Sequence, residues 1–191
     1  MTTEQMLHLS GSHLVPYIQI ATLLIGKSRY GGGNMFRHQI DTLAILIDYG
    51  YIDSVLLKAS LIHDVIEDIP DLNHNILLNI DFESHAVYDL VQEVSRRRDE
   101  SKPDFLLRVR EKGSHNAKIL KVADRISNVI SLGFVNNLDF IERYIKETVD
   151  YVLPIANDVS EHMTRELSDL VESRKKYLQN FRSQQAVAKG E

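Results

Sequence analysis

Apolar residues recur at three- and four-residue spacing along most of the chain, which is the spacing of a helix with one buried face. The pattern predicts longer helices over residues 38–49, 53–68, 84–98, 104–112, 115–131 and 138–181. It also predicts a short helix or turn over residues 71–75, and Ser54 is expected to cap the second helix. No segment alternates apolar and polar residues as a half-buried strand does. The chain is therefore expected to be an all-α helical bundle.

Glycine and polar residues interrupt this pattern most clearly over residues 26–34 and 97–103. Neither stretch has the composition of an interdomain linker. The 191 residues are therefore expected to form a single domain over residues 1–191, with a core that spans about residues 20–170. The final residues, 184–191, are expected to be a frayed tail.

The charge balance narrows the classes of partner. Lys and Arg total 22 and Asp and Glu total 27, a net charge of −5, so no general positive field attracts nucleic acid or an anionic membrane. The run Arg96-Arg97-Arg98 is expected to be a solvated helix end, or otherwise a rim that attracts phosphate. Since no apolar run reaches membrane length and no signal peptide begins the chain, a cytoplasmic location is expected.

The absence of cysteine excludes disulfides, thiolate zinc sites and cysteine nucleophiles. Any metal must therefore bind to His, Asp, Glu or water.

The main candidate for chemistry is the run His63-Asp64-Val65-Ile66-Glu67-Asp68. On a helix, His63 lies one turn from Glu67, and Asp64 lies one turn from Asp68, so the ionisable groups gather on one side. Carboxylates this close repel one another unless a cation or shared protons compensate, which favours a metal site. Taken alone, the run fits an exposed acidic helix end equally well.

Two distant residues extend this candidate. His38 begins a strongly apolar helix, where a single histidine is more often an ordinary hydrogen-bonded residue than a ligand. Asp124 stands in the middle of an apolar helix, and Asn128 shares its face. A buried pair between Asp124 and Arg125, or between Asp124 and a lysine, is an equally plausible interpretation. These residues alone leave both interpretations open.

Taken together, the motifs resemble the HD superfamily of metal-dependent phosphohydrolases, and most closely its RelA/SpoT-type hydrolase domain and the small alarmone hydrolases. An arginine, Arg29, stands nine residues before the first histidine, His38. The motif His-Asp-x-x-Glu-Asp occupies residues 63–68, and Lys-x-Ala-Asp-Arg-x-x-Asn occupies residues 121–128. The resemblance covers roughly residues 20–170 and implies the HD-domain helical bundle.

The resemblance implies a role for each motif residue. One divalent ion, usually manganese, would be held by His38, His63, Asp64 and Asp124. Glu67 and Asp68 would orient or deprotonate the attacking water and assist the leaving oxygen.

The resemblance also implies a set of substrate-binding residues. Asn128 would bond to the sugar of a nucleotide substrate. Arg29, with Lys27 and Arg37 nearby, would contact phosphates or stack on the base.

The chain departs from the family pattern around the substrate. The Pro-Tyr before the first histidine is Asn34-Met35 here, and the proline after that histidine is Gln39. The serine before the loop glycine is Gly31, and the Met-Arg after the motif asparagine is Val129-Ile130. The metal and catalytic positions are intact, so the reaction class is better supported than guanine specificity.

The resemblance implies an enzyme of the stringent response. It would hydrolyse the 3′-pyrophosphate of the alarmones guanosine tetra- and pentaphosphate to GDP or GTP and pyrophosphate. Because the chain ends soon after the motifs, it is expected to degrade alarmones and not to make them. One alternative is an HD phosphohydrolase for another nucleotide, such as a nucleoside monophosphate or a phosphorylated dinucleotide. A second alternative is a non-catalytic sensor that binds metal or nucleotide.

Overall fold

The structure is a computed structural model that describes residues 1–189, with side chains as far as residue 184. All regular elements of residues 1–189 are helical, which confirms the predicted all-α class. They are α1 (Thr3–Gly11), α2 (Val15–Ala21), η1 (Thr22–Leu24), α3 (Met35–Asp48), α4 (Ser54–Ile62), α5 (Val65–Asp68), α6 (Asn75–Leu78), α7 (Ser84–Val94), α8 (Lys102–Lys112), α9 (His115–Ser131), η2 (Leu132–Phe134), α10 (Leu138–Glu147), the π-helical turn η3 (Thr148–Val152), α11 (Leu153–Val159) and α12 (Glu161–Lys189).

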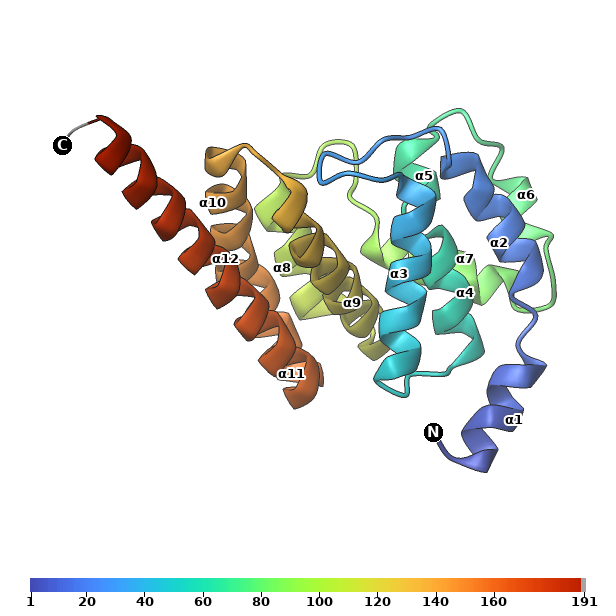
Figure 1. The fold of residues 1–191 in the computed structure, drawn as a ribbon. Coiled ribbons are helices and arrows are strands. Elements are labelled where there is room, and N and C mark those ends of the chain that lie inside the picture. The colour runs from blue at the N-terminus through green and yellow to red at the C-terminus, as the bar shows by residue number, and fades with distance from the viewer. Residues whose placement is uncertain (190–191) are drawn as a thin grey trace.

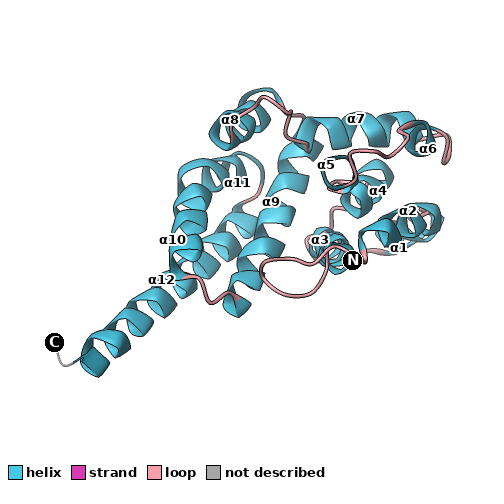
Figure 2. Ribbon diagram, turned by 90° about the horizontal axis from the view of Figure 1, so that it is seen from above, coloured by secondary structure: helices cyan, strands magenta, loops and turns pink. Residues whose placement is uncertain are grey.

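Helices α3, α4 and α9 form the centre of the bundle (Figure 1). α3 packs against both α4 and α9, while α4 also packs against α2 and α7. On its other side α9 contacts α11 and α12, so it lies between α3 on one side and these two helices on the other (Figure 2). The inward faces supply fully buried apolar side chains such as Leu46, Leu57 and Ile126. Burial of this apolar surface is the main force that holds the helices together.

The expected single helix over residues 53–68 is wrong, because the chain breaks between α4 and α5 at His63 and Asp64. The imidazole Nδ1–H of His63 donates to the Ser60 carbonyl oxygen at 2.8 Å. In a continuing helix that carbonyl would accept the amide of Asp64, so the histidine side chain competes with the helix for it. The expected cap, Ser54, is also wrong, since the carboxylate of Asp53 accepts the Leu56 amide at 2.9 Å.

The expected helix over residues 138–181 is wrong as one element. It divides into α10, η3, α11 and α12. Pro154 has no amide hydrogen to donate and lies in the first turn of α11. Ser160 is extended, with φ −159° and ψ 111°, and its hydroxyl accepts the Met163 amide at the start of α12. The helix over residues 115–131 is confirmed as α9.

Other boundaries shift by a few residues. The helix expected over residues 84–98 ends at Val94, so residues 96–98 lie in a loop. α1 and α2 were not predicted from the pattern. The expected frayed tail is helical in its backbone as far as Lys189, and its last two residues lie outside the described part. None of the described helices is both long and apolar enough to cross a membrane.

Residues 26–34 form the expected irregular segment, which runs between η1 and α3. The Arg29 amide donates to the Gly33 carbonyl, and the Gly32 amide donates to the Arg29 carbonyl, each at 3.1 Å. Gly32 and Gly33 have φ of 86° and 72°, which a residue with a side chain rarely adopts. The segment crosses beside the N-terminal end of α3, where the first of the candidate ligands stands (Figure 1).

Candidate metal site and adjoining cavity

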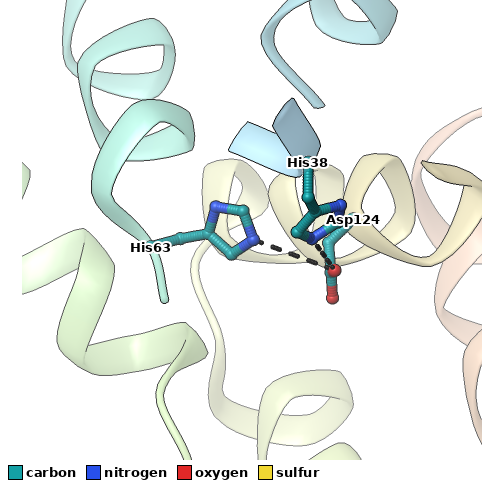
Figure 3. Close-up of side chains that lie close together, drawn as sticks. All are labelled: His38, His63 and Asp124. Carbon is teal, nitrogen blue, oxygen red and sulfur yellow. Dashed lines mark hydrogen bonds and ion pairs between the residues drawn. The ribbon is translucent and has the colours of Figure 1, made fainter. Parts of the chain in front are cut away.

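Three helices bring His38, His63 and Asp124 to one point inside the bundle (Figure 3). His38 comes from the first turns of α3, His63 from the end of α4, and Asp124 from the middle of α9. One ligand atom from each lies within 4.8 Å of the others. All three residues are buried, with at most 5% of their surface exposed. Buried charges gathered in this way require a compensating partner.

Both histidines use Nδ1 within the protein and turn Nε2 toward Asp124. His63 Nδ1 bonds to the Ser60 carbonyl, and His38 Nδ1 lies 2.8 Å from the hydroxyl of Ser127. His38 Nε2 lies 3.0 Å from Asp124 Oδ1. His63 Nε2 is 3.8 Å from the same oxygen and has no hydrogen-bond partner among the described residues. A histidine that ligates a metal is anchored in this way, with its second nitrogen free for the ion.

Asp64 lies at the edge of this cluster. Its Oδ2 is 3.3 Å from His63 Nε2 and 3.5 Å from His38 Nε2, and its side chain is 22% exposed. The amide of Gln39 donates to the same oxygen at 2.9 Å. The structure therefore brings all four expected ligand residues to one place, with Asp64 toward solvent. The contact of Gln39 was not predicted, although its position had stood out as a departure from the family.

The electrostatics of the cluster favour a positive charge. Burial lowers the pKa of His63, but the carboxylates of Asp64 and Asp124 outweigh it and raise the pKa to about 9. Burial raises the pKa of Asp124, but Lys121 and the two histidines outweigh it and hold the pKa well below its usual range. A divalent cation meets the same demand as the extra proton, since metal and proton compete for these ligands. The donor set therefore fits a metal ion.

The alternative pairings of Asp124 are only partly formed. Lys121 Nζ lies 2.7 Å from Asp124 Oδ2, so the lysine pair exists beside the histidine cluster. Arg125 instead bonds to Glu147 at 2.6 Å, and its guanidinium lies 4.3 Å from the centre of the Tyr144 ring. Asp124 therefore contacts a cation and two histidines at once.

A cavity of 410 Å³ opens beside the cluster. Its lining includes the carboxylates of Asp64, Glu67 and Asp124, and it also includes four cationic side chains, those of Arg96, Lys102, Lys121 and Arg125. Desolvation, with the charges of Arg125 and Lys121, lowers the pKa of Lys102. The crowded cations would gain free energy from an anion between them. Of the run 96–98 only Arg96 lines this cavity, and all three arginines are exposed, as the solvated interpretation expected.

The expected catalytic pair divides between two environments. Glu67 lines the cavity, and its Oε1 accepts the backbone amide of Arg96 at 2.8 Å. Burial raises the pKa of Glu67, although the Arg96 amide opposes the shift. Asp68 turns instead toward Lys27, whose Nζ lies 2.9 Å from its Oδ1. Only Glu67 of this pair lines the cavity.

A second pocket of 200 Å³ adjoins the cavity and shares Met35, Asn128 and Tyr144 with it. The rest of its lining is largely aromatic or from the glycine-rich segment, namely Ser28, Arg29, Tyr30, Gly31, Ser131, Leu132 and Phe140. A flat, partly apolar group would fit against such walls.

Hydrogen bonds connect this pocket to the metal cluster. Arg29 donates to Asn128 Oδ1 at 2.8 Å and to the Ser131 hydroxyl at 3.0 Å. Asn128 in turn donates to Asp124 Oδ1 at 2.5 Å. Of the expected substrate-binding residues, Arg29 and Asn128 line the pocket, whereas Lys27 contacts Asp68. Arg37 has a side chain 76% exposed and pairs with Asp41, away from the cluster.

Comparison with known proteins finds sequence relatives among the hydrolases that the motifs resemble. No family model matches the chain. It is similar to a probable guanosine-3′,5′-bis(diphosphate) 3′-pyrophosphohydrolase of Mycoplasma genitalium, 26% identical over 160 residues, which are 75% of this chain and 22% of the relative. The corresponding enzyme of Haemophilus influenzae is 26% identical over 152 residues, covering 76% of this chain and 22% of that enzyme. The chain thus spans less than a quarter of the length of these relatives.

A solved structure of a metazoan SpoT ortholog, reported to hydrolyse ppGpp and to play a role in starvation responses, has the same fold. The TM-score is 0.74 at 21% sequence identity, and the match covers 84% of this chain and 94% of that one. These likenesses confirm the predicted fold class and the resemblance that the motifs indicate.

Proposed function

We propose that this chain, a relative of the RelA/SpoT-type hydrolases, is a metal-dependent phosphohydrolase that removes the 3′-pyrophosphate from guanosine tetra- and pentaphosphate. The observation that carries the proposal is the buried cluster of His38, His63 and Asp124, which opens into a cavity lined by cations. Two imidazoles and carboxylates suit a divalent metal, and the cations suit a polyanionic substrate. The names of the sequence relatives support the choice of substrate.

The proposed ligands are His38, His63, Asp64 and Asp124, and the proposed ion is Mn²⁺. Imidazole and carboxylate ligands with room for water suit this metal. Bound there, a divalent ion would lower the pKa of water and neutralise charge that develops on phosphoryl oxygens. The free Nε2 of His63 and the Nε2 of His38 are already aimed at Asp124, so little rearrangement of the rings is needed.

Glu67 is the proposed proton acceptor, and Asp68 is proposed to assist it. Burial raises the pKa of Glu67, which makes its carboxylate a stronger proton acceptor. Water adds to the phosphorus that is bonded to the 3′ oxygen. The bond between this phosphorus and the 3′ oxygen breaks, and pyrophosphate is released. The 3′ oxygen takes a proton and becomes the hydroxyl of GDP or GTP.

The cavity and the second pocket are proposed to bind different parts of the substrate. Arg96, Lys102 and Lys121 would contact the pyrophosphate in the larger cavity. The nucleoside would lie in the second pocket, here called the aromatic pocket because Tyr30, Phe140 and Tyr144 line it. Asn128 would lie near the sugar and Arg29 against the base.

A second candidate function is hydrolysis of another phosphorylated nucleotide. No carboxylate lines the aromatic pocket within the described residues, so no acidic side chain is placed there to read the donor edge of guanine. Gly31, which stands where the family has serine, also offers no side-chain hydroxyl there. We therefore expect a relaxed base preference.

The substrate is tested by comparing guanosine and adenosine 3′-pyrophosphates with 5′-monophosphates, using purified protein and Mn²⁺. Release of pyrophosphate from the 3′-pyrophosphates is the expected result. Release of phosphate from monophosphates, with the 3′-pyrophosphates intact, would favour the second candidate. Binding without turnover would point to a non-catalytic sensor.

The metal site is tested separately by elemental analysis. The unaltered chain should hold about one divalent ion, and His63→Ala or Asp64→Ala should lose it, because removing one ligand from a buried set leaves too few donors. His162→Ala, at a histidine outside the cluster, is the matched control and should retain the ion. Equal metal content in all four proteins would contradict the assignment.

A further inference from the structure

We infer that Gln39 is a positioning residue for the metal site, which holds the carboxylate of Asp64 ready to bind the cation. The inference rests on the metal site of the proposed function and assigns a role to a residue that the family pattern does not contain. At this position the related enzymes are expected to have a proline, which offers no side-chain donor.

The backbone of α3 places two consecutive polar residues in the bundle. His38 reaches across to Asp124 on α9, with 3.0 Å between Nε2 and Oδ1. Gln39 reaches Asp64 between α4 and α5, with 2.9 Å between Nε2 and Oδ2. One turn of α3 thus contacts both carboxylates of the cluster. The side chain of Gln39 is fully buried.

The Asp64 oxygen that accepts the hydrogen bond from Gln39 also lies close to both histidines of the cluster. Asp64 Oδ2 is also the carboxylate oxygen that lies 3.3 Å from His63 Nε2 and 3.5 Å from His38 Nε2. Only the NH₂ group of an amide can face a carboxylate favourably, because two oxygens would repel each other. The bond therefore fixes the rotation of the Asp64 side chain, which is otherwise partly exposed.

The other end of the amide indicates that this contact is not kept for stability alone. Gln39 Oε1 is buried and has no hydrogen-bond partner among the described residues. A buried acceptor without a donor costs free energy, and an apolar side chain of the same shape would avoid that cost. The benefit of glutamine must then lie in what its NH₂ group does for Asp64. Residues that hydrogen-bond to metal ligands raise metal affinity by orienting them.

The test compares Gln39→Met with the unaltered chain by calorimetric titration with Mn²⁺ and by thermal unfolding in a chelator. Methionine keeps the length and volume of glutamine but lacks the donor. We expect Mn²⁺ affinity to fall on the order of 10–100-fold. The unfolding temperature in chelator should stay the same or rise, because the unpaired oxygen is gone. Gln39→Asn keeps an amide that is one methylene too short, and the same loss of affinity is expected.

Thr42→Val is the matched control. It removes a buried polar group from the same helix, and the Thr42 hydroxyl bonds to the His38 carbonyl without touching a carboxylate. Its Mn²⁺ affinity should remain near that of the unaltered chain.

Wild-type Mn²⁺ affinity in both Gln39 variants would overturn the inference. So would a large loss of stability in chelator for both, which would make the role structural. If the unaltered chain binds Mn²⁺ but cleaves no 3′-pyrophosphate, the proposed substrate fails and the role of Gln39 stands. If the unaltered chain binds no metal, the metal site and this inference fail together.

Discussion

Each of the two buried histidines uses one ring nitrogen for a hydrogen bond within the protein and turns the other toward the proposed metal site. In each, Nδ1 bonds to a neighbouring protein oxygen and Nε2 faces Asp124. The anchor sets the direction of the ring before any ion arrives, so less entropy is lost on binding. Ser60 and Ser127 provide these anchors, Ser60 through its backbone and Ser127 through its hydroxyl. The backbone anchor at His63 therefore depends on the end of α4 and not on the identity of residue 60.

The first prediction at this scale concerns Glu67. Glu67→Gln should retain the metal, because its carboxylate bonds to the Arg96 amide and not to the histidines. Turnover of the native substrate should fall on the order of 10²–10⁴-fold, since an amide cannot accept the proton of water. Single-turnover kinetics with parallel elemental analysis measures both.

Glu172→Gln serves as the control for that experiment, because Glu172 is exposed on α12 and pairs with Lys175. Near-normal turnover in Glu67→Gln would make Glu67 a bystander, and loss of the metal would make it a ligand.

At the scale of elements, the loop between α7 and α8 positions Glu67 through the amide of Arg96. Arg108 on α8 braces this loop. Its guanidinium donates to the carbonyls of Glu93 and Ser95, at 2.9 and 2.8 Å, and to both carboxylate oxygens of Glu100, at 2.7 and 3.0 Å. A paired arrangement of this kind fixes geometry as well as energy.

Arg108→Met should therefore impair catalysis, although Arg108 itself does not line the cavity. With the loop released, Glu67 loses its fixed partner, and turnover should fall by up to about 10²-fold, as small misplacements of catalytic groups do. Mn²⁺ affinity should stay the same, because no expected ligand contacts the loop. Steady-state kinetics and calorimetry separate the two effects.

Arg110→Met is the comparison, since Arg110 lies on the same helix in a largely exposed pair with Asp158. Equal turnover in the two variants would show that the loop does not need its brace.

At the scale of the whole molecule, a buried lysine joins α4 to the elements around it. Lys58 is 1% exposed and lies 2.6 Å from Asp81 and 2.5 Å from Glu83, which precede α7. The Tyr17 hydroxyl on α2 donates to Asp81, and the rings of Tyr17 and Phe82 lie beside the ammonium group. Ser54 donates to Glu83. Burial raises the pKa of Asp81 and of Glu83, but the contact with Lys58 lowers both. The net effect is that both pKa values are lowered.

This network predicts how stability depends on pH. Because the carboxyl pKa values are lower in the folded protein than in the unfolded chain, their contribution is complete above about pH 5 and is lost as the pH falls through the folded values. Lys58→Met leaves two carboxylates without their cation and should destabilise the protein by about 3–5 kcal/mol near neutral pH. The difference from the unaltered chain should shrink as the pH falls from the unfolded pKa values toward the lowered folded ones, because the carboxyls then take up protons.

Chemical denaturation at several pH values, with metal chelated, measures this difference. Lys146→Met is the control, because Lys146 forms an exposed pair with Asp150 and should change stability by at most about 1 kcal/mol. A difference for Lys58→Met that stays constant from neutral pH to pH 3 would contradict the account.

The helical bundle and the resemblance to HD hydrolases follow from the sequence by itself. Helical spacing and the identity of motif residues are local properties, so α9 was predicted with its bounds and all four expected ligands meet at one place. The ends of helices were predicted less well. The break after Ile62 depends on a side-chain bond to a carbonyl, which competes with the helix in a way that periodicity does not express.

Only the tertiary structure decided which side chains face one another. His38 and Asp124 are 86 residues apart, and their contact exists because α3 packs on α9. The packing of α3 on α4 likewise brings Gln39 to Asp64. By contrast, the pairs Lys121–Asp124 and Arg37–Asp41 form within single helices, at three- and four-residue spacing. The reason is physical: sequence spacing sets the face of a helix that a residue occupies, but the partner of that face is chosen by how whole helices bury their apolar surface.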